Sequence, residues 1–154
     1  MKLIRILLIS ALALLTVSSV AAAKDFGWIR NFNKEAKSDP PQFRTMMAER
    51  FDLSDVQVLA LRNIFASPAD AYIMLRLGEM QDGGLRKLSK EKAIAAVNTY
   101  RGNRDKGWNA LAKMLGVETE SKEFIALKSG HDLDRDPQHD QVAYTGYGRS
   151  KDRL

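Results

Sequence analysis

The spacing of apolar residues along the chain predicts short helices rather than strands. Between residues 41 and 129, apolar side chains recur at intervals of three and four, which places them on one face of a helix. No stretch shows the convincing alternation of apolar and polar residues that marks a half-buried strand. We therefore expect an all-α domain of about five or six short helices over residues 41–130, in an orthogonal or bundle-like arrangement.

Capping residues and prolines indicate where the first helices begin. Two prolines stand at the start of a predicted helix over residues 41–50, and Ser38 or Asp39 can cap it. A second helix should follow Asp52 or Ser54, with an apolar face that includes Val58 and Leu61.

A third helix should begin near Pro68 and end before Gly83 and Gly84. Its apolar residues fall at intervals of four, four and three, so they form one stripe that we expect to be buried. These residues are Ala69, Ile73, Leu77 and Met80.

Three more helices are predicted in the second half of the chain. Ser89 can cap a helix that runs to Arg101, and a polar loop follows at residues 102–106. A short helix from Trp108 ends at Gly116, which suits a left-handed C-terminal position. The last helix runs over residues 121–129 and is stopped by Gly130.

The two ends of the chain differ from this core. Residues 24–40 contain aromatic side chains that could dock as a short helix on the body of the domain. Residues 131–154 contain few apolar side chains, too few to offset the entropy of ordering, so we expect a flexible polar tail.

Residues 1–23 have the pattern of a secretory signal peptide. Lys2 and Arg5 precede an apolar run from Ile6 to Val20, and three alanines then supply the small residues of a cleavage site. We expect the mature chain to begin at Lys24 and to be exported to the periplasm or the extracellular space. The alternative is an uncleaved membrane anchor, because the apolar run approaches the roughly 20 residues that span a bilayer. Charged residues interrupt every later apolar run, so no other transmembrane segment is predicted.

The absence of cysteine excludes disulfides, thiol redox chemistry and lipid attachment to an N-terminal cysteine. Stability must therefore come from packing without cross-links, and no cofactor-binding motif is present.

Positive charge gathers in the second half of the chain. Residues 86–130 contain ten basic and five acidic side chains, whereas residues 24–85 contain eight basic and nine acidic ones. Outside the cytoplasm such a surface could attract an envelope polyanion, but an excess this small is common on solvated helix surfaces, which is the interpretation that we favour. The candidate contacts are Arg86, Lys87, Lys90, Arg101, Arg104 and Lys106.

The expected tail holds the densest set of metal-ligand side chains. Oxygen donors at alternate positions resemble the start of a calcium loop, but Pro137 replaces the required glycine and Ala143 the closing glutamate. Weak binding of Zn²⁺, Ni²⁺ or Cu²⁺ through the two histidines is the remaining metal hypothesis. The candidate ligands are His131, Asp132, Asp134, Asp136, His139 and Asp140.

Catalytic motifs are missing from the helical region. Neither a G-x-S-x-G nucleophile turn nor an H-E-x-x-H helix is present, and both histidines fall in the expected tail. Glu79 and Asp70 are conceivable carboxylates for a hydrolase of cell-wall glycans, a hypothesis that requires two acids about 5–10 Å apart. We expect a protein that is not an enzyme.

Two motifs resemble known families. The run G-W-N-A-L-A-K-M-L-G-V at residues 107–117 resembles the first helix of a helix-turn-helix unit, here within residues 89–128. That resemblance implies DNA binding through Lys122 and Lys128. Export argues against nucleic acid as a partner, so we interpret the motif as helix packing.

The residues L-S-D-V-Q at 53–57 resemble the LTxxQ element of the periplasmic Spy and CpxP-like stress proteins, with Ser in place of Thr. The resemblance implies a helical, exported chaperone or stress regulator. A simpler explanation of these residues is that Ser54 caps a helix whose first turn contains the acidic Asp55. More broadly, the core is similar to small exported bacterial proteins of unknown function, through P-A-D-A-Y at 68–72 and S-x-E-F-x-A-L-K at 121–128.

The sequence thus predicts an exported, non-enzymatic helical protein that binds an envelope protein or polyanion, through an apolar groove or its basic second half. The alternatives are a Spy-like chaperone and a carboxylate-dependent cell-wall hydrolase.

Overall fold

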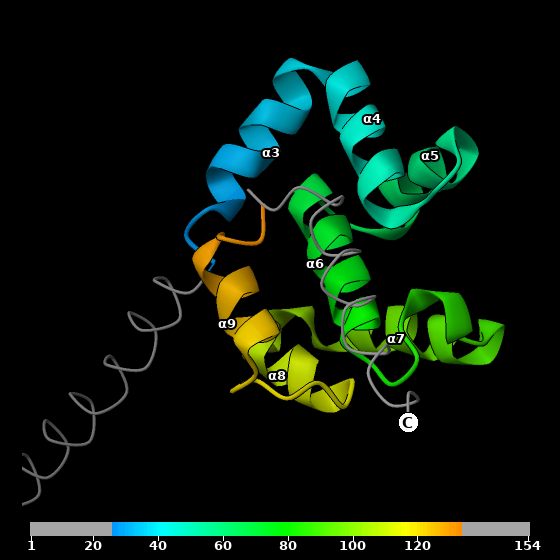
Figure 1. Cartoon of the computed structure of the whole chain (residues 1–154), viewed down its shortest axis with the longest axis vertical. Helices are drawn as coiled ribbons and strands as arrows, with labels where there is room; N and C mark the ends of the chain where they lie inside the picture. Colours follow the sequence, from blue (N-terminus) through cyan, green and yellow to red (C-terminus); the bar gives the residue numbers. More distant parts are fainter. Residues whose placement is uncertain (1–25, 134–154) are drawn as a thin grey trace, which may run out of the picture.

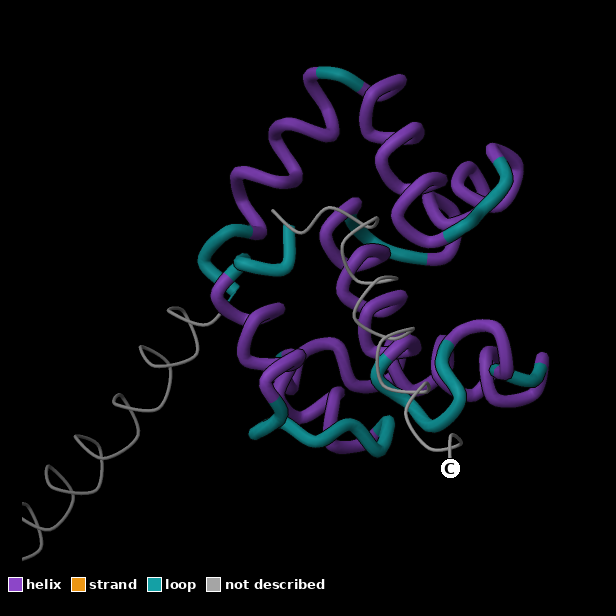
Figure 2. The backbone as a smooth tube through the Cα atoms, viewed as in Figure 1, coloured by secondary structure: helices purple, strands orange, loops and turns teal. Residues whose placement is uncertain are grey.

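A computed structural model describes residues 26–133, which form seven α-helices and two 3₁₀ turns (Figure 1). This range contains no strand, so the described chain consists of helices and loops (Figure 2) and the all-α prediction is confirmed. Residues 1–25 and 134–154 lie outside the described part, and with them the predicted signal peptide and most of the predicted tail. The helices are α3 (Ile29–Ser38), α4 (Pro40–Phe51), α5 (Asp55–Ile64), α6 (Pro68–Glu79), α7 (Lys90–Asn103), α8 (Trp108–Met114) and α9 (Lys122–Ser129), and the turns are η1 (Leu85–Lys87) and η2 (Arg104–Lys106).

Side-chain caps fix the start of most helices. Asp39 accepts a hydrogen bond from the backbone N–H of Gln42 at the start of α4, and Ser67, Ser89 and Ser121 do the same for α6, α7 and α9. At the C-terminal ends, Gly116 has a φ angle of 76°, the left-handed conformation predicted for it, and Gly130, predicted to stop the last helix, has a φ angle of 82°.

Helix α6 is the centre of the fold. It contacts α3, α5, α9 and η1, and Figure 1 shows it surrounded by the other helices. Ala69, Ile73 and Leu77 of the predicted stripe are fully buried, but so is almost every other residue from Ala69 to Gly78. The expectation of one buried stripe was therefore too narrow, because α6 is enclosed on all sides and carries polar residues into the core.

Aromatic residues connect the first described residues to both α6 and α9. Phe26 and Phe32 are buried, and the ring of Trp28 meets the ring of Tyr72 on α6 edge-on at 5.9 Å. The indole N–H of Trp28 donates a hydrogen bond to the carbonyl of Leu127 on α9 at 2.8 Å. The N-terminal and C-terminal ends of the described chain are thus joined directly.

The second half of the chain holds α7, α8 and α9. The polar stretch at 102–106 is not an open loop, because α7 continues to Asn103 and η2 follows it directly. The connection between α8 and α9 covers residues 115–121, longer than the turn of about three or four residues in a typical helix-turn-helix unit. In the described range, no helix has the length and apolar character needed to span a membrane.

Candidate functional site

A buried ion pair joins the last turn of α6 to the end of the described chain. Arg76 and Asp132 are both buried, and Asp132 is only 1% exposed. The Nε of Arg76 donates to Oδ2 of Asp132 at 2.5 Å and its Nη2 donates to Oδ1 at 2.6 Å. This two-pronged geometry is the strongest form of arginine–carboxylate contact.

The guanidinium group of Arg76 also contacts a second carboxylate, which extends the network to α4. The remaining nitrogen of Arg76, Nη1, donates to Glu79 one turn further along α6. Both oxygens of Glu79 also accept hydrogen bonds from Arg50 on α4, each at 3.1 Å. Two arginines and two carboxylates therefore alternate, and their formal charges cancel.

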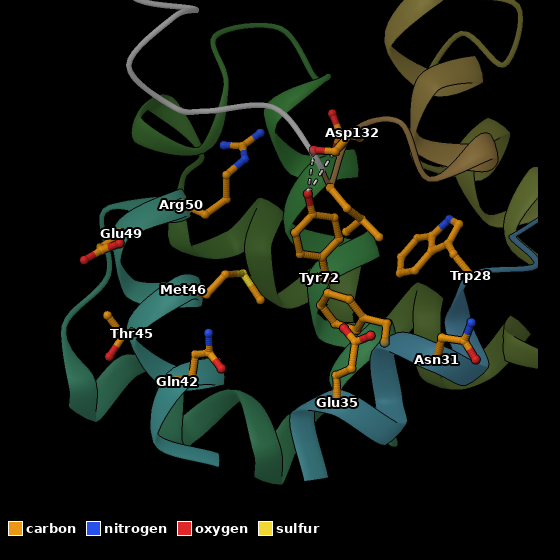
Figure 3. A pocket seen from close by; sticks show the side chains of 12 residues that line it. Trp28, Asn31, Glu35, Gln42, Thr45, Met46, Glu49, Arg50, Tyr72 and Asp132 are labelled. Atoms are coloured by element: carbon orange, nitrogen blue, oxygen red, sulfur yellow. Dashed lines mark hydrogen bonds between the residues drawn. The ribbon is translucent and has the colours of Figure 1, made fainter. Parts of the chain in front are cut away.

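Tyr72 completes the buried network from the preceding turn of α6. Its hydroxyl donates to Oδ2 of Asp132 at 3.0 Å, which the dashed lines in Figure 3 mark. Burial, together with the negative charge of Asp132, raises the pKa of Tyr72 well above its ordinary value. Tyr72 thus stays neutral and acts as a hydrogen-bond donor.

The hydrogen bonds offset the cost of burying Arg76. Burial alone lowers the pKa of Arg76, but the hydrogen bond to Asp132 and the charges of Asp132 and Glu79 outweigh it and raise that pKa. Among the described residues, no buried side-chain nitrogen or oxygen lacks a hydrogen-bond partner. A fully partnered network of this kind holds a fold in one arrangement.

A pocket of about 700 Å³ opens beside this network (Figure 3). Helices α3 and α4 form its walls, and Tyr72 and Asp132 lie at its inner end. We call it the aromatic pocket, because its apolar lining comprises Trp28, Phe32, Met46, Tyr72 and Leu133. The polar residues at its edge are Asn31, Glu35, Gln42, Thr45, Glu49 and Arg50.

A second polar cluster lies at the start of α6. The hydroxyl of Tyr100 on α7 donates to buried Asp70 at 2.5 Å and accepts from the backbone N–H of Ala66 at 3.2 Å. Burial, and then the hydrogen bond to Asp70, raise the pKa of Tyr100. Arg104 adds an ion pair to Asp70 at 3.5 Å, so this cluster ties α7 and η2 to α6.

The structure separates the two carboxylates of the hydrolase hypothesis. Asp70 and Glu79 are nine positions apart on α6, which corresponds to about 13 Å along the axis at a rise of 1.5 Å per residue. Glycoside hydrolysis needs a separation of roughly 5–10 Å. Asp70 also contacts Tyr100 and Arg104, whereas Glu79 contacts two arginines, so the two acids belong to different clusters.

Only two of the candidate metal ligands lie within the described residues. His131 is exposed, whereas Asp132 is buried and has Arg76 as its partner. Asp134, Asp136, His139 and Asp140 lie outside the described residues. Within residues 26–133, no group of three or more His, Asp or Glu side chains is placed to hold a metal ion. The expectation that the tail begins at residue 131 was wrong for Asp132, which belongs to the folded core.

The basic candidates lie on the surface, as a polyanion contact requires. All six are exposed and are spread over η1, α7 and η2. Two of them have acidic partners: Arg86 pairs with Asp52 at 3.0 Å, and Arg104 pairs with Asp70. Of the two lysines that the helix-turn-helix resemblance singled out, Lys122 is exposed and Lys128 is half-buried.

In the LTxxQ-like element, Ser54 and Gln57 form the N-terminal cap of α5. The backbone N–H of Ser54 donates to Oε1 of Gln57 at 2.8 Å, and the Ser54 hydroxyl accepts from the backbone N–H of Gln57. This reciprocal arrangement is a capping box. It accounts for the Ser and the Gln of that element without a further role.

Sequence reasoning missed Arg50, Tyr72 and Arg76 as parts of a site. One signal was available for Arg76: it is a cation flanked by leucines within a predicted buried helix, and a buried arginine needs a partner. Its partner Asp132 lies 56 positions away in the sequence, so no local pattern could identify it.

Removing either member of the Arg76–Asp132 pair should strongly destabilise the protein. Arg76→Met leaves buried Asp132 without a counter-charge, and Asp132→Asn leaves Arg76 and Arg50 to share Glu79 alone, so each should lower the free energy of unfolding by about 3–5 kcal/mol. The double variant should lose about 2 kcal/mol less than the sum of the two single losses. Urea denaturation measures all three values.

Asp52→Asn is the matched control, because it breaks an ion pair whose two side chains are more than four-fifths exposed. That variant should change stability by less than about 1 kcal/mol. Additive losses in the double variant, or an Asp132→Asn loss as small as the control's, would show that the buried pair is not coupled.

Comparison of the chain with known protein families, with curated proteins and with solved structures gives no significant match.

Proposed function

We propose that this chain is an exported, non-catalytic binding protein that holds a cationic, apolar segment of an envelope protein in the aromatic pocket. The observation that carries the proposal is the composition of that pocket: aromatic rings line it, and two carboxylates at its edge have no ion pair within the described chain.

The charge of the pocket follows from which of its residues are already paired. Arg50 is neutralised by Glu79, and Asp132 is neutralised by Arg76. Glu35 on α3 and Glu49 on α4 are exposed and remain as unpaired negative charges. The pocket therefore attracts a positive group, and the attraction should weaken as salt screens it.

The aromatic lining favours the same kind of ligand. The face of an indole or phenol ring attracts a Lys or Arg head group, and the apolar part of the ligand is removed from water at the same time. Trp28 and Tyr72 supply such rings. A volume of about 700 Å³ accommodates a few side chains rather than a whole domain.

The inner end of the pocket supports a binding role rather than a catalytic one. Acid–base catalysis needs a group that is free to exchange a proton with the substrate. Here Asp132, Glu79 and the Tyr72 hydroxyl are all hydrogen-bonded within the network. They hold the pocket in shape and present no free acid or base to a ligand.

Export is the second part of the proposal, and it rests on the signal-peptide pattern of residues 1–23. A Spy-like chaperone remains the alternative binding function. Its sequence motivation is weaker now that Ser54 and Gln57 form a capping box.

Export predicts a specific N-terminus. N-terminal sequencing of the protein purified from cells that produce it should start at Lys24, because cleavage follows the alanines at 21–23. A chain that starts at Met1 and stays with the membrane fraction would contradict cleavage and favour the anchor.

The aromatic pocket should bind a cationic amphipathic peptide. We expect a short peptide of repeated Leu-Lys-Lys-Leu units to bind the purified protein, measured by isothermal titration calorimetry. The double variant Glu35→Gln/Glu49→Gln should bind roughly tenfold more weakly, since it removes two exposed charge contacts of up to about 1 kcal/mol each. Raising the salt concentration should weaken binding to the unmodified protein more than binding to this variant.

Glu91→Gln is the control, because Glu91 is an exposed carboxylate on α7 outside the pocket lining. Equal affinity of the control and the double variant would contradict the proposed site. Peptide binding that occurs only after residues 134–154 are removed would show that the pocket's occupant is the chain's own C-terminal segment rather than a partner.

A further inference from the structure

A second hollow lies on another face of α4, with the opposite charge. It has a volume of about 320 Å³ and is formed by the end of α3, by α4 and α5, and by the start of α6. Positions 43, 44 and 47 of α4 line it, whereas positions 42, 45, 46 and 49 line the aromatic pocket. The 3.6-residue period of a helix places these two sets on different faces.

The interior of this hollow is apolar. Met47 and Val58 are buried at its base, and three half-buried side chains, Phe43, Leu61 and Phe65, extend the apolar surface toward the opening. Such a lining removes a hydrocarbon chain from water at a gain of roughly 0.8 kcal/mol for each buried methylene.

Every charged residue that lines the hollow is basic. Lys37, Arg44 and Arg62 come from three different helices, and no carboxylate is among the lining residues. None of the three forms an ion pair with any residue in the described range. We call this site the basic groove.

Helix ends explain two of these cations but not the third. Lys37 and Arg62 lie in the last turns of α3 and α5, where a positive charge complements the helix dipole. Arg44 lies in the middle of α4 and is half-buried, so the dipole gives no reason for its charge there. A partly buried arginine without an acidic partner, beside an apolar hollow, is suited to an anion with an apolar tail.

We propose that the basic groove binds one molecule of a long-chain carboxylate, a fatty-acid-type anionic amphiphile. The hydrocarbon chain lies on Phe43, Met47 and Leu61, and the carboxylate is held by Arg44 and Arg62. A planar guanidinium donates two parallel hydrogen bonds to a carboxylate, whereas a lysine offers a single point charge.

The size of the groove favours a single chain over a lipid surface. Its volume is at the lower end of the range for small-molecule sites, which are roughly 300–1,000 Å³. This site is independent of the aromatic pocket and of the proposed peptide partner, because the two share no lining residue.

The experiment is a calorimetric titration of the full chain with dodecanoate below its micelle concentration. We expect saturable binding of one molecule per chain. Acetate, which has the head group alone, should not bind, and dodecyltrimethylammonium, which has the same tail and the opposite charge, should bind at least roughly tenfold more weakly.

Variants locate the site. Arg44→Gln/Arg62→Gln should weaken dodecanoate binding roughly tenfold or more, because both carboxylate contacts are lost. Lys113→Gln removes an exposed cation on α8, outside the groove, and should leave the affinity unchanged. Circular dichroism and urea denaturation of each variant establish that the fold is retained. Glu35→Gln/Glu49→Gln, which changes only the aromatic pocket, should bind dodecanoate with unchanged affinity.

Four results would overturn the proposal. They are equal binding of the cationic amphiphile, binding of several dodecanoate molecules per chain, unchanged affinity of the arginine double variant, and no dodecanoate binding by a folded protein. If a peptide of Leu-Glu-Glu-Leu repeats binds at Arg44 and Arg62 while dodecanoate does not, the groove's partner is an acidic protein segment and the lipid proposal is wrong.

Discussion

The pairing of Arg76 with Asp132 is the constraint on which the rest of this fold depends. Arg76 lies in the last turn of helix α6, and its guanidinium group is buried among the neighbouring elements. A buried guanidinium is tolerated only with a counter-charge and satisfied hydrogen bonds. Asp132 meets that requirement, and the chain beyond α9 must therefore fold back onto α6.

The same pairing shapes the aromatic pocket. Asp132 orients the Tyr72 hydroxyl, and Glu79 extends the network to Arg50 on α4. The inner end of the pocket is thus fully hydrogen-bonded and formally neutral, and only Glu35 and Glu49 give the opening its charge. On the other faces of α3 and α4, Lys37 and Arg44 give the basic groove the opposite sign. One pair of helices therefore separates two sites with complementary charges.

Local signals predicted the helices well, because caps and glycines act over a few residues. Asp39, Ser54 and Ser121 begin their helices as expected, and Gly130 ends the last one. The two pockets could not be predicted in this way, since each combines side chains from several helices. Asp132 was assigned to a tail because its surroundings in the sequence are polar, although its partner lies on α6. The sequence offered Asp70 and Glu79 only as conceivable catalytic carboxylates, and their partners show that they stabilise the packing of α6.

The most direct test of this account is the exchange rate of the Arg76 Nε proton, measured by nuclear magnetic resonance at neutral pH. The structure predicts slow exchange with solvent, because this proton is buried and bonded to Asp132. Arg86 provides the reference, since its ion pair with Asp52 is exposed and its Nε proton should exchange quickly. Exchange at Arg76 as fast as at Arg86 would contradict the claim that a buried ion pair holds the segment around Asp132 against α6.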